Sequence, residues 1–470
     1  TRVRSSAASD VYKRQVVELQ VGDSNFIHLT PLKEIDSDNN SIYVLIDQEN
    51  KPWMKLRHSG SNFVILEKSE EITESIENLD AKLDQLLLKV IESEQSGTEN
   101  TETTIEPLID PYDPDKIKVS SKQFSIKLIK DMIDGGDVDL SPDFQRNFVW
   151  NSGQKSRLIE SILLRIPLPM FYFSEDDEGR LVVIDGLQRL TTINEFMDNK
   201  FPLWGLEYLN KNCEGRYYKE EDGKKGLDAK YFRWFNLTQL SSNVIDPSSP
   251  TKVKYDIFRR INTGGKPLNN QEIRNCLAGK GLRETLKKMV NLPEFKRATD
   301  HSIKSTRMDD QEVALRFILF HELINEDETL DNYTGYIEQL MDDITERLVK
   351  KEEKDLSHYV DLFSKSMKNA YYLFGSRYAF RKIQLKDIEP GAYKQLINKA
   401  LFVSWSVLLS KYDPVLIEER NSVQALLMPL AKEITEDQQF LYYLSSGTNG
   451  KANVRYAFMK ASMIIEDFLK

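Results

Sequence analysis

The chain has 470 residues, 40% hydrophobic and 29% charged with a net charge of −10, so it is long enough for two or three domains. Its two cysteines exclude a disulfide scaffold and a thiolate zinc cluster, and its five histidines lie too far apart to have metal-ligand spacing. The longest apolar run, at residues 401–409, contains two serines and is about half of the ~20 residues that a membrane span needs, so we expect a cytoplasmic protein without a membrane segment.

The charge is unevenly distributed along the chain. Residues 16–115 hold 7 Lys/Arg and 22 Asp/Glu, whereas residues 251–307 hold 14 Lys/Arg and 5 Asp/Glu. A local basic excess is typical of a segment that meets a phosphate-bearing partner, and it is equally typical of a solvated helix surface. Charge alone therefore leaves both interpretations of residues 251–307 open.

The N-terminal quarter is predicted to contain a small module and a linker. Residues 1–15 match nothing that follows and resemble adaptor-derived, non-native sequence, so they are left out of the fold prediction. Residues 16–94 combine four short apolar runs, typical of strands, with a final segment of helical spacing and an acidic outer face. This helix packs on its own module or pairs in a short coiled coil, and the first is commoner at this length. Residues 95–115 are acidic, contain three prolines and are typical of a linker.

The remaining chain is predicted to hold an α+β domain at residues 116–277 and an α-helical domain at residues 278–470. In the first, the periodicity predicts helices at 120–136, 152–166 and 187–199, strands at 169–176 and 180–185, and an aromatic, loop-rich segment at 206–250. In the second, it predicts amphipathic helices near 309–327, 334–352, 356–375, 391–411, 416–434 and 451–469.

The segment LVVIDGLQRLTT at residues 181–192 is the first candidate site. An apolar strand ends at Asp185, a glycine permits a sharp turn, and Gln188 and Arg189 fall in the first turn of a helix. A helix N-terminus favours an anion, and Arg189 adds a bidentate phosphate donor. Asp185 is suited to a divalent cation and Gln188 to orienting a water. The alternative is a structural turn in which Asp185 caps the helix and Arg189 forms a surface ion pair.

The segment FQRNFVWN at residues 144–151 is the second candidate. Gln145 and Arg146 stand among aromatic residues, a combination that can stack on a base and contact phosphate. The alternative is an aromatic corner of the core in which Arg146 forms a structural ion pair.

The segment FRRINTGGKPL at residues 258–268 is the third candidate. Asn262 precedes two glycines, so the backbone can approach a ligand closely, and Arg260 and Lys266 are cationic neighbours. The segment is not a Walker A loop, because it lacks the four-residue spacer and the Ser or Thr. The alternative is a helix-capping turn.

Together and in this order, FQRNFVW, SRLIESILLRIPLP, VVIDGLQRLTT and FRRINTGGKPLNNQEIRN resemble the N-terminal domain of GmrSD-type restriction endonucleases, which is also present in the SspE phage-defence protein. The resemblance runs from about Val119 to Asn275 and is weaker through KSTRMDDQEVALRF at residues 304–317. It implies an α+β fold in which a ParB/sulfiredoxin-like nucleotide-binding domain is followed by an α-helical domain and preceded by the small β-rich module with one helix. It also implies a bacterial protein that binds, and hydrolyses, a nucleoside triphosphate with Mg²⁺ and has DNA as a partner in a restriction or phage-defence system.

The resemblance also assigns roles to residues. Asp185, Gln188 and Arg189 are implied to be catalytic, with Asp185 also a Mg²⁺ ligand. The implied nucleotide-binding residues are Gln145, Arg146, Gly186, Thr191, Arg260, Asn262, Gly264 and Lys266. Leu187 stands where many relatives have a second glutamine, which weakens a role for that side chain.

One departure from the family pattern affects the predicted activity. Full-length restriction members carry an HNH-type nuclease half, which needs clustered His and Asn ligands. The histidines after residue 300, which are His301, His321 and His358, do not cluster in the sequence. We therefore expect a regulatory or specificity component without its own nuclease half. Either a separate subunit supplies the nuclease, or the protein does something other than cut DNA.

Two other hypotheses remain open at this point. The chain could be a non-enzymatic DNA-binding module with a vestigial nucleotide site, whose binding would depend on salt and ignore nucleotide. It could also be a nuclease that uses carboxylates such as Asp143, Asp185 or Glu272 with Mg²⁺, although no carboxylate pair has recognisable nuclease spacing.

Overall fold

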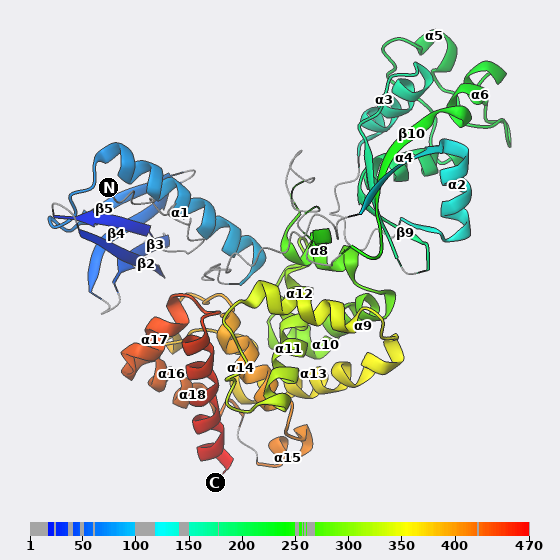
Figure 1. Ribbon diagram of the computed structural model, residues 1–470. Helices are drawn as coiled ribbons and strands as arrows, with labels where there is room; N and C mark the ends of the chain where they lie inside the picture. Colours follow the sequence, from blue (N-terminus) through cyan, green and yellow to red (C-terminus); the bar gives the residue numbers. More distant parts are fainter. Residues whose placement is uncertain are drawn as a thin grey trace, which may run out of the picture. The chain divides into compact units, whose positions relative to one another are not determined.

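A computed structural model describes residues 17–22, 25–35, 41–47, 51–59, 62–98, 118–140, 150–176, 178–249, 253–255, 257, 260, 268–420 and 423–469. The chain divides into two compact units. The central unit is Leu108–Ala278, and the composite unit joins Thr1–Pro107 to Gly279–Lys470. The protein is of mixed α+β class, with a β-rich N-terminal module and a helical C-terminal region (Figure 1).

The central unit is built on a mixed five-stranded sheet. Its strands are β6 (Val119–Ser125), β7 (Val138–Asp139), β8 (Phe171–Glu175), β9 (Leu181–Asp185) and β10 (Gln239–Ile245). Its helices are α2 (Ile126–Gly135), α3 (Ser152–Leu163), α4 (Leu187–Met197), α5 (Asn210–Cys213), α6 (Ala229–Leu237) and α8 (Asn270–Leu277). The strand order is β6-β10-β8-β9-β7, with antiparallel β6–β10 and β8–β9 pairs and parallel β10–β8 and β9–β7 pairs.

Local capping signals set the ends of two helices in the central unit. Ser125 accepts a hydrogen bond from the Leu128 N–H at the start of α2, and Gly136 ends that helix in the left-handed region, at φ 83°. Asn151 forms a reciprocal capping box with Gln154 at the start of α3. The predicted helix end at Gly136 and the predicted start of a helix after Asn151 are therefore confirmed.

The prediction of one continuous helix over residues 120–136 is wrong in its first half. Residues 119–125 form β6, which pairs along its whole length with β10. Most of β6 is exposed, so its sequence carries no strand alternation, and pairing with a strand about 120 residues away determines its conformation. The partner strand β10 and helix α6 both lie in the segment that the sequence analysis predicts to be loop-rich.

The N-terminal module of the composite unit is an antiparallel meander with one helix. Its strands, in sheet order, are β1 (Val17–Val21), β2 (Asn25–Ile35), β3 (Ser41–Ile46), β4 (Pro52–Ser59) and β5 (Asn62–Lys68). The helix α1 (Ile76–Ser96) places Leu79, Leu83 and Leu86 in one buried cluster with Leu19 and Leu45 of the sheet. The helix therefore packs on its own module, which is the commoner of the two roles predicted from the sequence.

The C-terminal part of the composite unit is helical. Its elements are α9 (Lys280–Asn291), α10 (Pro293–Ala298), α11 (Asp309–Glu326), α12 (Ile337–Leu348), α13 (Glu353–Phe374), the 3-10 helix η3 (Leu385–Ile388), α14 (Lys399–Leu409), α15 (Pro414–Glu418), α16 (Leu427–Glu436), α17 (Gln438–Ser445) and α18 (Lys451–Leu469). The most apolar of them, α14, is buried on nearly all sides and places Trp405 in the core. Across the stretches that the structure describes, none of the helices has the length and apolar character needed to cross a membrane.

The two segments of the composite unit meet through backbone contacts just after α1. The Lys304 N–H donates to the Ser96 carbonyl at 3.1 Å, and the Ile397 N–H donates to the Gly97 carbonyl at 3.2 Å. A Cβ at Gly97 would lie 1.9 Å from the carbonyl oxygen of Ser302, so only glycine permits this approach. Backbone pairing thus joins parts of the chain that are more than 200 residues apart in sequence.

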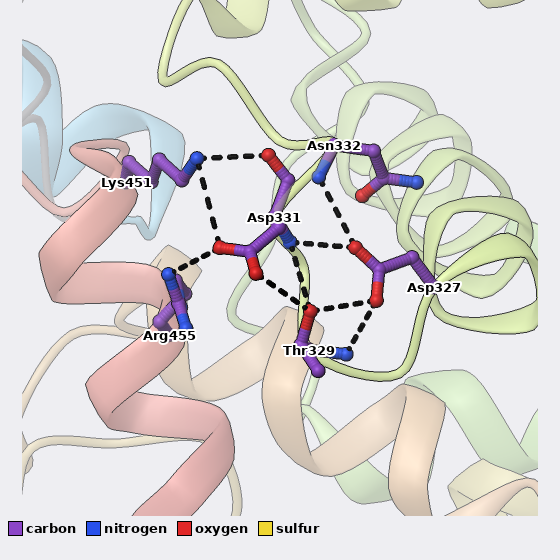
Figure 2. A network of polar contacts seen from close by, with 6 residues as sticks. All are labelled: Asp327, Thr329, Asp331, Asn332, Lys451 and Arg455. Atoms are coloured by element: carbon purple, nitrogen blue, oxygen red, sulfur yellow. Dashed lines mark hydrogen bonds and ion pairs between the residues drawn. The ribbon is translucent and has the colours of Figure 1, made fainter.

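The loop between α11 and α12 is held by its own aspartates and by α18 (Figure 2). Asp327 accepts hydrogen bonds from the N–H and the hydroxyl of Thr329, which lower the pKa of Asp327. Arg455 Nη1 donates to Asp331 Oδ1 at 2.7 Å, and Lys451 Nζ donates to the Asp331 carbonyl at 2.8 Å. These contacts neutralise Asp331 and fix the loop against the last helix.

Candidate functional site

The candidate site starts at the end of β9, where the chain turns into α4. The β8–β9 register shifts by one residue between Tyr172 and Phe173, so that Asp185 lies opposite Tyr172. A shift of this kind bends a strand and redirects the side chains that follow it. Gly186 then occupies the N-cap position of α4, at φ 97°, and makes no side-chain cap. Asp185 is therefore the last strand residue and not the cap of the helix.

Only glycine fits at position 186. A Cβ there would lie 2.4 Å from Cδ1 of Phe171 and 3.1 Å from Nη2 of Arg189, and the positive φ adds backbone strain. We expect Gly186→Ala to destabilise the central unit by about 2–5 kcal/mol, measured by urea unfolding and by amide hydrogen exchange in β8 and α4.

Gly136→Ala is the matched control for this prediction. Gly136 also has a positive φ, 83°, but nothing lies within 4 Å of its Cβ position. Its replacement should cost only the backbone strain, about 1–2 kcal/mol. Equal losses in the two variants would show that the contact with Phe171 does not constrain the turn.

Arg189 points back across the turn towards β8. Its guanidinium donates to the Pro169 carbonyl, to the Met170 carbonyl at 3.1 Å and to Asp185 Oδ2 at 2.9 Å. It also stacks on Phe171, with 4.2 Å between Cζ and the ring centroid. The side chain is only 11% exposed, and burial lowers the pKa of Arg189 while Asp185 opposes the shift.

The structural alternative, in which Asp185 caps the helix and Arg189 forms a surface ion pair, is wrong in its first part and only partly right in its second. Gly186 is the N-cap, and Arg189 pairs with Asp185 in a partly buried setting. Three of the five guanidinium N–H donors of Arg189 are used in these bonds, so two remain. Phe171 is the first residue of β8 and the two carbonyls belong to the residues just before it, and sequence reasoning missed all three contacts. Their only signal in the sequence was the aromatic run within the predicted strand at residues 169–176.

The first turn of α4 offers backbone donors. The Leu190 N–H bonds to the Gly186 carbonyl, whereas the N–H groups of residues 187–189 donate to no residue that the structure describes. Gln188 and Thr191 are partly exposed on this turn and the next. The arrangement suits an anion at the helix N-terminus, with the Asp185–Arg189 pair beside it.

The structure describes only some of the other predicted site residues. Gln145, Arg146, Asn262, Gly264 and Lys266 lie outside the described residues, as does Asp143. Arg260 is described and exposed. The structure thus brings Asp185, Gly186 and Arg189 together, with Gln188 and Thr191 on the same helix, and their predicted convergence with the other two segments stays a prediction.

The helix α8, which follows the third candidate segment, packs against β9. It starts with a capping box between Asn269 and Glu272. Gln271 is 2% exposed and donates to Asn275 Oδ1 at 3.1 Å, while its own Oε1 is buried and has no hydrogen-bond partner in the described chain. The Glu272 carboxylate takes part in this helix cap, which is a structural role; the nuclease role considered from the sequence stays a hypothesis.

Carboxylates, histidines and cysteines form no metal-binding group of three or more within the described ranges. Burial lowers the pKa of His321 on α11, Glu322 opposes this shift, and the nearby His358 on α13 lowers the pKa further. Asn325 lies 3.2 Å from His321 Nδ1. The absence of an HNH-type nuclease half remains a prediction.

The central unit is thus an α+β unit in which strand β9 passes through a glycine turn into helix α4, and an aspartate and an arginine form an ion pair at this turn. Residues 126–278 match the family model of the GmrSD restriction endonuclease N-terminal domain. The matched segment begins with α2 and contains the whole β9–α4 turn, so the resemblance seen in the sequence is confirmed for this part of the chain. A search of curated proteins found none that matches. The match indicates a role related to restriction or phage defence.

Proposed function

We propose that the central unit is a ParB/sulfiredoxin-like domain that binds a nucleoside triphosphate with Mg²⁺ at the β9–α4 turn. The match of residues 126–278 to the GmrSD N-terminal domain carries this proposal. The chain would act in the bacterial cytoplasm as the regulatory or specificity component of a DNA restriction or anti-phage system. DNA would be its partner, and a separate subunit would supply the nuclease.

The geometry of the turn supports phosphate binding. The N–H groups of residues 187–189 at the N-terminus of α4 are suited to phosphate oxygens, and the helix dipole favours a negative charge there. Arg189 holds Asp185 in place and offsets its charge, so a phosphate chain meets no net negative field. The two remaining guanidinium donors are available for a phosphate oxygen. Gln188, partly exposed on the same turn, would position the attacking water.

Asp185 is suited to bind a Mg²⁺ ion that the nucleotide phosphates also bind. Its side chain is 39% exposed, and its Oδ2 is occupied by Arg189. Mg²⁺ in nucleotide sites takes only one or two protein carboxylates and completes its shell with phosphate and water, so one carboxylate suffices. Bound there, Mg²⁺ would neutralise phosphate charge.

Binding and turnover of the four ribonucleoside triphosphates, with and without Mg²⁺, test the proposal. We expect Arg189→Lys, which loses the planar fork, to weaken nucleotide binding by roughly 10- to 150-fold. Gln188→Ala should keep binding and lower turnover by about 100-fold. Gln239→Ala, which changes an exposed glutamine of the same unit, is the matched control and should change neither.

A folded wild-type chain that binds no nucleotide would refute this proposal. DNA binding that persists without nucleotide would then favour the non-enzymatic DNA-binding module. The basic excess at residues 251–307 would be its main feature.

A further inference from the structure

Two large aromatic side chains stand exposed on one loop of the central unit, in the segment that follows α4. In this loop, residues 204–209, Trp204 is 56% and Tyr208 is 74% exposed. Exposed aromatic residues that gather on one surface are typical of binding sites, because burial on a partner would recover their hydrophobic free energy. We call residues 204–209 the aromatic loop.

Side chains below the aromatic loop hold its backbone in one conformation. The N–H of Trp204 donates to Ser156 Oγ at 3.0 Å. The next two N–H groups, of Gly205 and Leu206, donate to the Glu214 carboxylate at 2.8 and 3.2 Å. The last three, of Glu207, Tyr208 and Leu209, donate to the Glu160 carboxylate at 3.1, 2.8 and 2.8 Å. Six consecutive amides thus point inwards, and the loop presents Trp204 and Tyr208 without an ordering cost on binding.

The two anchors on α3 place the aromatic loop along that helix. Ser156 and Glu160 are one turn apart and are 0% and 4% exposed, so both belong to the same buried face. Their separation corresponds to a rise of about 6 Å along α3. Trp204 and Tyr208 are therefore attached at successive points of one rigid element.

A third aromatic residue, flanked by cations, lies on the neighbouring helix α6. Trp234 has Lys230 Nζ at 4.5 Å and Arg165 Cζ at 5.7 Å from its ring centroid. Asn212 of α5, the helix that continues the aromatic loop, donates to the Tyr231 hydroxyl of α6 at 2.9 Å. The helices α3, α5 and α6 gather at one end of the central unit (Figure 1).

This end of the unit carries exposed cations that no carboxylate pairs with in the described chain. Arg165, Lys211, Lys230 and Arg233 are exposed, and within the described chain none of the four pairs with a carboxylate. The nearby acidic groups have other partners: Glu160 and Glu214 accept the loop amides, Glu207 lies 3.5 Å from Arg157, and Asp228 lies 3.4 Å from Arg216. Aromatic rings and unpaired cations are the features with which proteins hold single-stranded nucleic acid.

We propose that the aromatic loop and α6 form a binding surface for single-stranded DNA. Trp204 and Tyr208 stack on unpaired bases, and the four cations contact the phosphates. A single strand fits better than a duplex, because base faces are open to stacking only where the strand is unpaired. The inference uses no residue of the β9–α4 turn, so it can fail or succeed independently of nucleotide binding.

Binding of a labelled oligodeoxythymidylate to the full chain, measured by fluorescence anisotropy, tests the proposal. We expect Trp204→Ala and Tyr208→Ala each to weaken binding by roughly 5- to 150-fold, which is the range for losing one stacked base. Trp204→Phe keeps a stacking ring and should retain most of the affinity. Lys230→Ala should instead lower the slope of log affinity against log salt by about 0.7, as loss of one phosphate contact does.

Phe26→Ala is the matched control, since Phe26 is 57% exposed but lies on β2 of the other unit. It should leave the affinity unchanged. A wild type that binds no single strand, or Trp204→Ala and Tyr208→Ala variants that are folded and bind like wild type, would overturn the proposal. So would binding of a duplex of the same length more tightly than the single strand. If the two variants lost a protein partner and kept the oligonucleotide, the surface would be a protein interface instead.

Discussion

Glu312→Gln is expected to destabilise the composite unit by about 3–5 kcal/mol, because it removes a carboxylate that binds two buried cations. Glu312, in the first turn of α11, accepts Arg316 Nε and Nη2 at 2.9 and 2.7 Å and Lys399 Nζ at 3.0 Å. The Arg316 and Lys399 side chains are 3% and 11% exposed. Urea unfolding together with hydrogen exchange in α11 and α14 measures the effect.

The loss in Glu312→Gln should depend on pH. Burial would raise the pKa of Glu312, but Lys399 and Arg316 outweigh it and hold the pKa well below its usual range. A depressed carboxyl pKa contributes stability above the unfolded value, ~4.3 for glutamate, and that contribution fades as the pH falls through the folded pKa. The difference in unfolding free energy between wild type and variant should therefore be largest near neutral pH and become smaller under acid conditions. A difference that does not depend on pH would contradict the ion-pair explanation.

Asp310→Asn is the matched control and should change the free energy of unfolding in the opposite direction. Asp310 is 8% exposed, and burial raises its pKa from 3.8 to about 6. A raised carboxyl pKa costs stability as the pH rises through the interval between the unfolded and folded values. The asparagine variant should accordingly be more stable at neutral pH, by about 2–3 kcal/mol, and lose this advantage below the unfolded pKa. A less stable Asp310→Asn at neutral pH would contradict this assignment.

Glu160→Ala is expected to destabilise the central unit by about 3–6 kcal/mol, because three backbone donors lose a buried acceptor. The carboxylate, which is 4% exposed, accepts the N–H groups of Glu207, Tyr208 and Leu209. Because the acceptor is buried, water replaces these bonds less readily than it replaces a surface ion pair. Urea unfolding gives the global loss, and faster hydrogen exchange at residues 207–209 locates it.

Glu207→Ala serves as the control for this prediction. Glu207 belongs to the same loop, but its side chain is 57% exposed and its contact with Arg157 spans 3.5 Å. An exposed pair of this kind contributes little, so the loss should be below about 1 kcal/mol. If Glu160→Ala cost no more than Glu207→Ala, the aromatic loop would not depend on the carboxylate below it.

The local sequence was sufficient to predict the helix ends and turns whose hydrogen bonds join residues only a few positions apart. Ser125 and Gly136 bound α2, the Asn151–Gln154 box starts α3, and Gly186 marks the turn into α4. The order of the three candidate segments was also enough to indicate the family whose model matches residues 126–278. Each of these signals lies in a short stretch of chain, where capping, glycine conformation and periodicity determine the structure.

Only the tertiary structure decided the contacts between distant segments. It made residues 119–125 a strand, because they pair with β10, and it joined the N-terminal module to the C-terminal helices in one unit. It placed Arg189 against Phe171 and two carbonyls before β8, and it set Glu160 under a loop almost 50 residues away. The physical reason is that an exposed strand or a buried carboxylate has no preferred partner in its own segment, and a long arginine side chain can reach groups beyond its own segment. These partners are therefore chosen when the sheet and helices pack together.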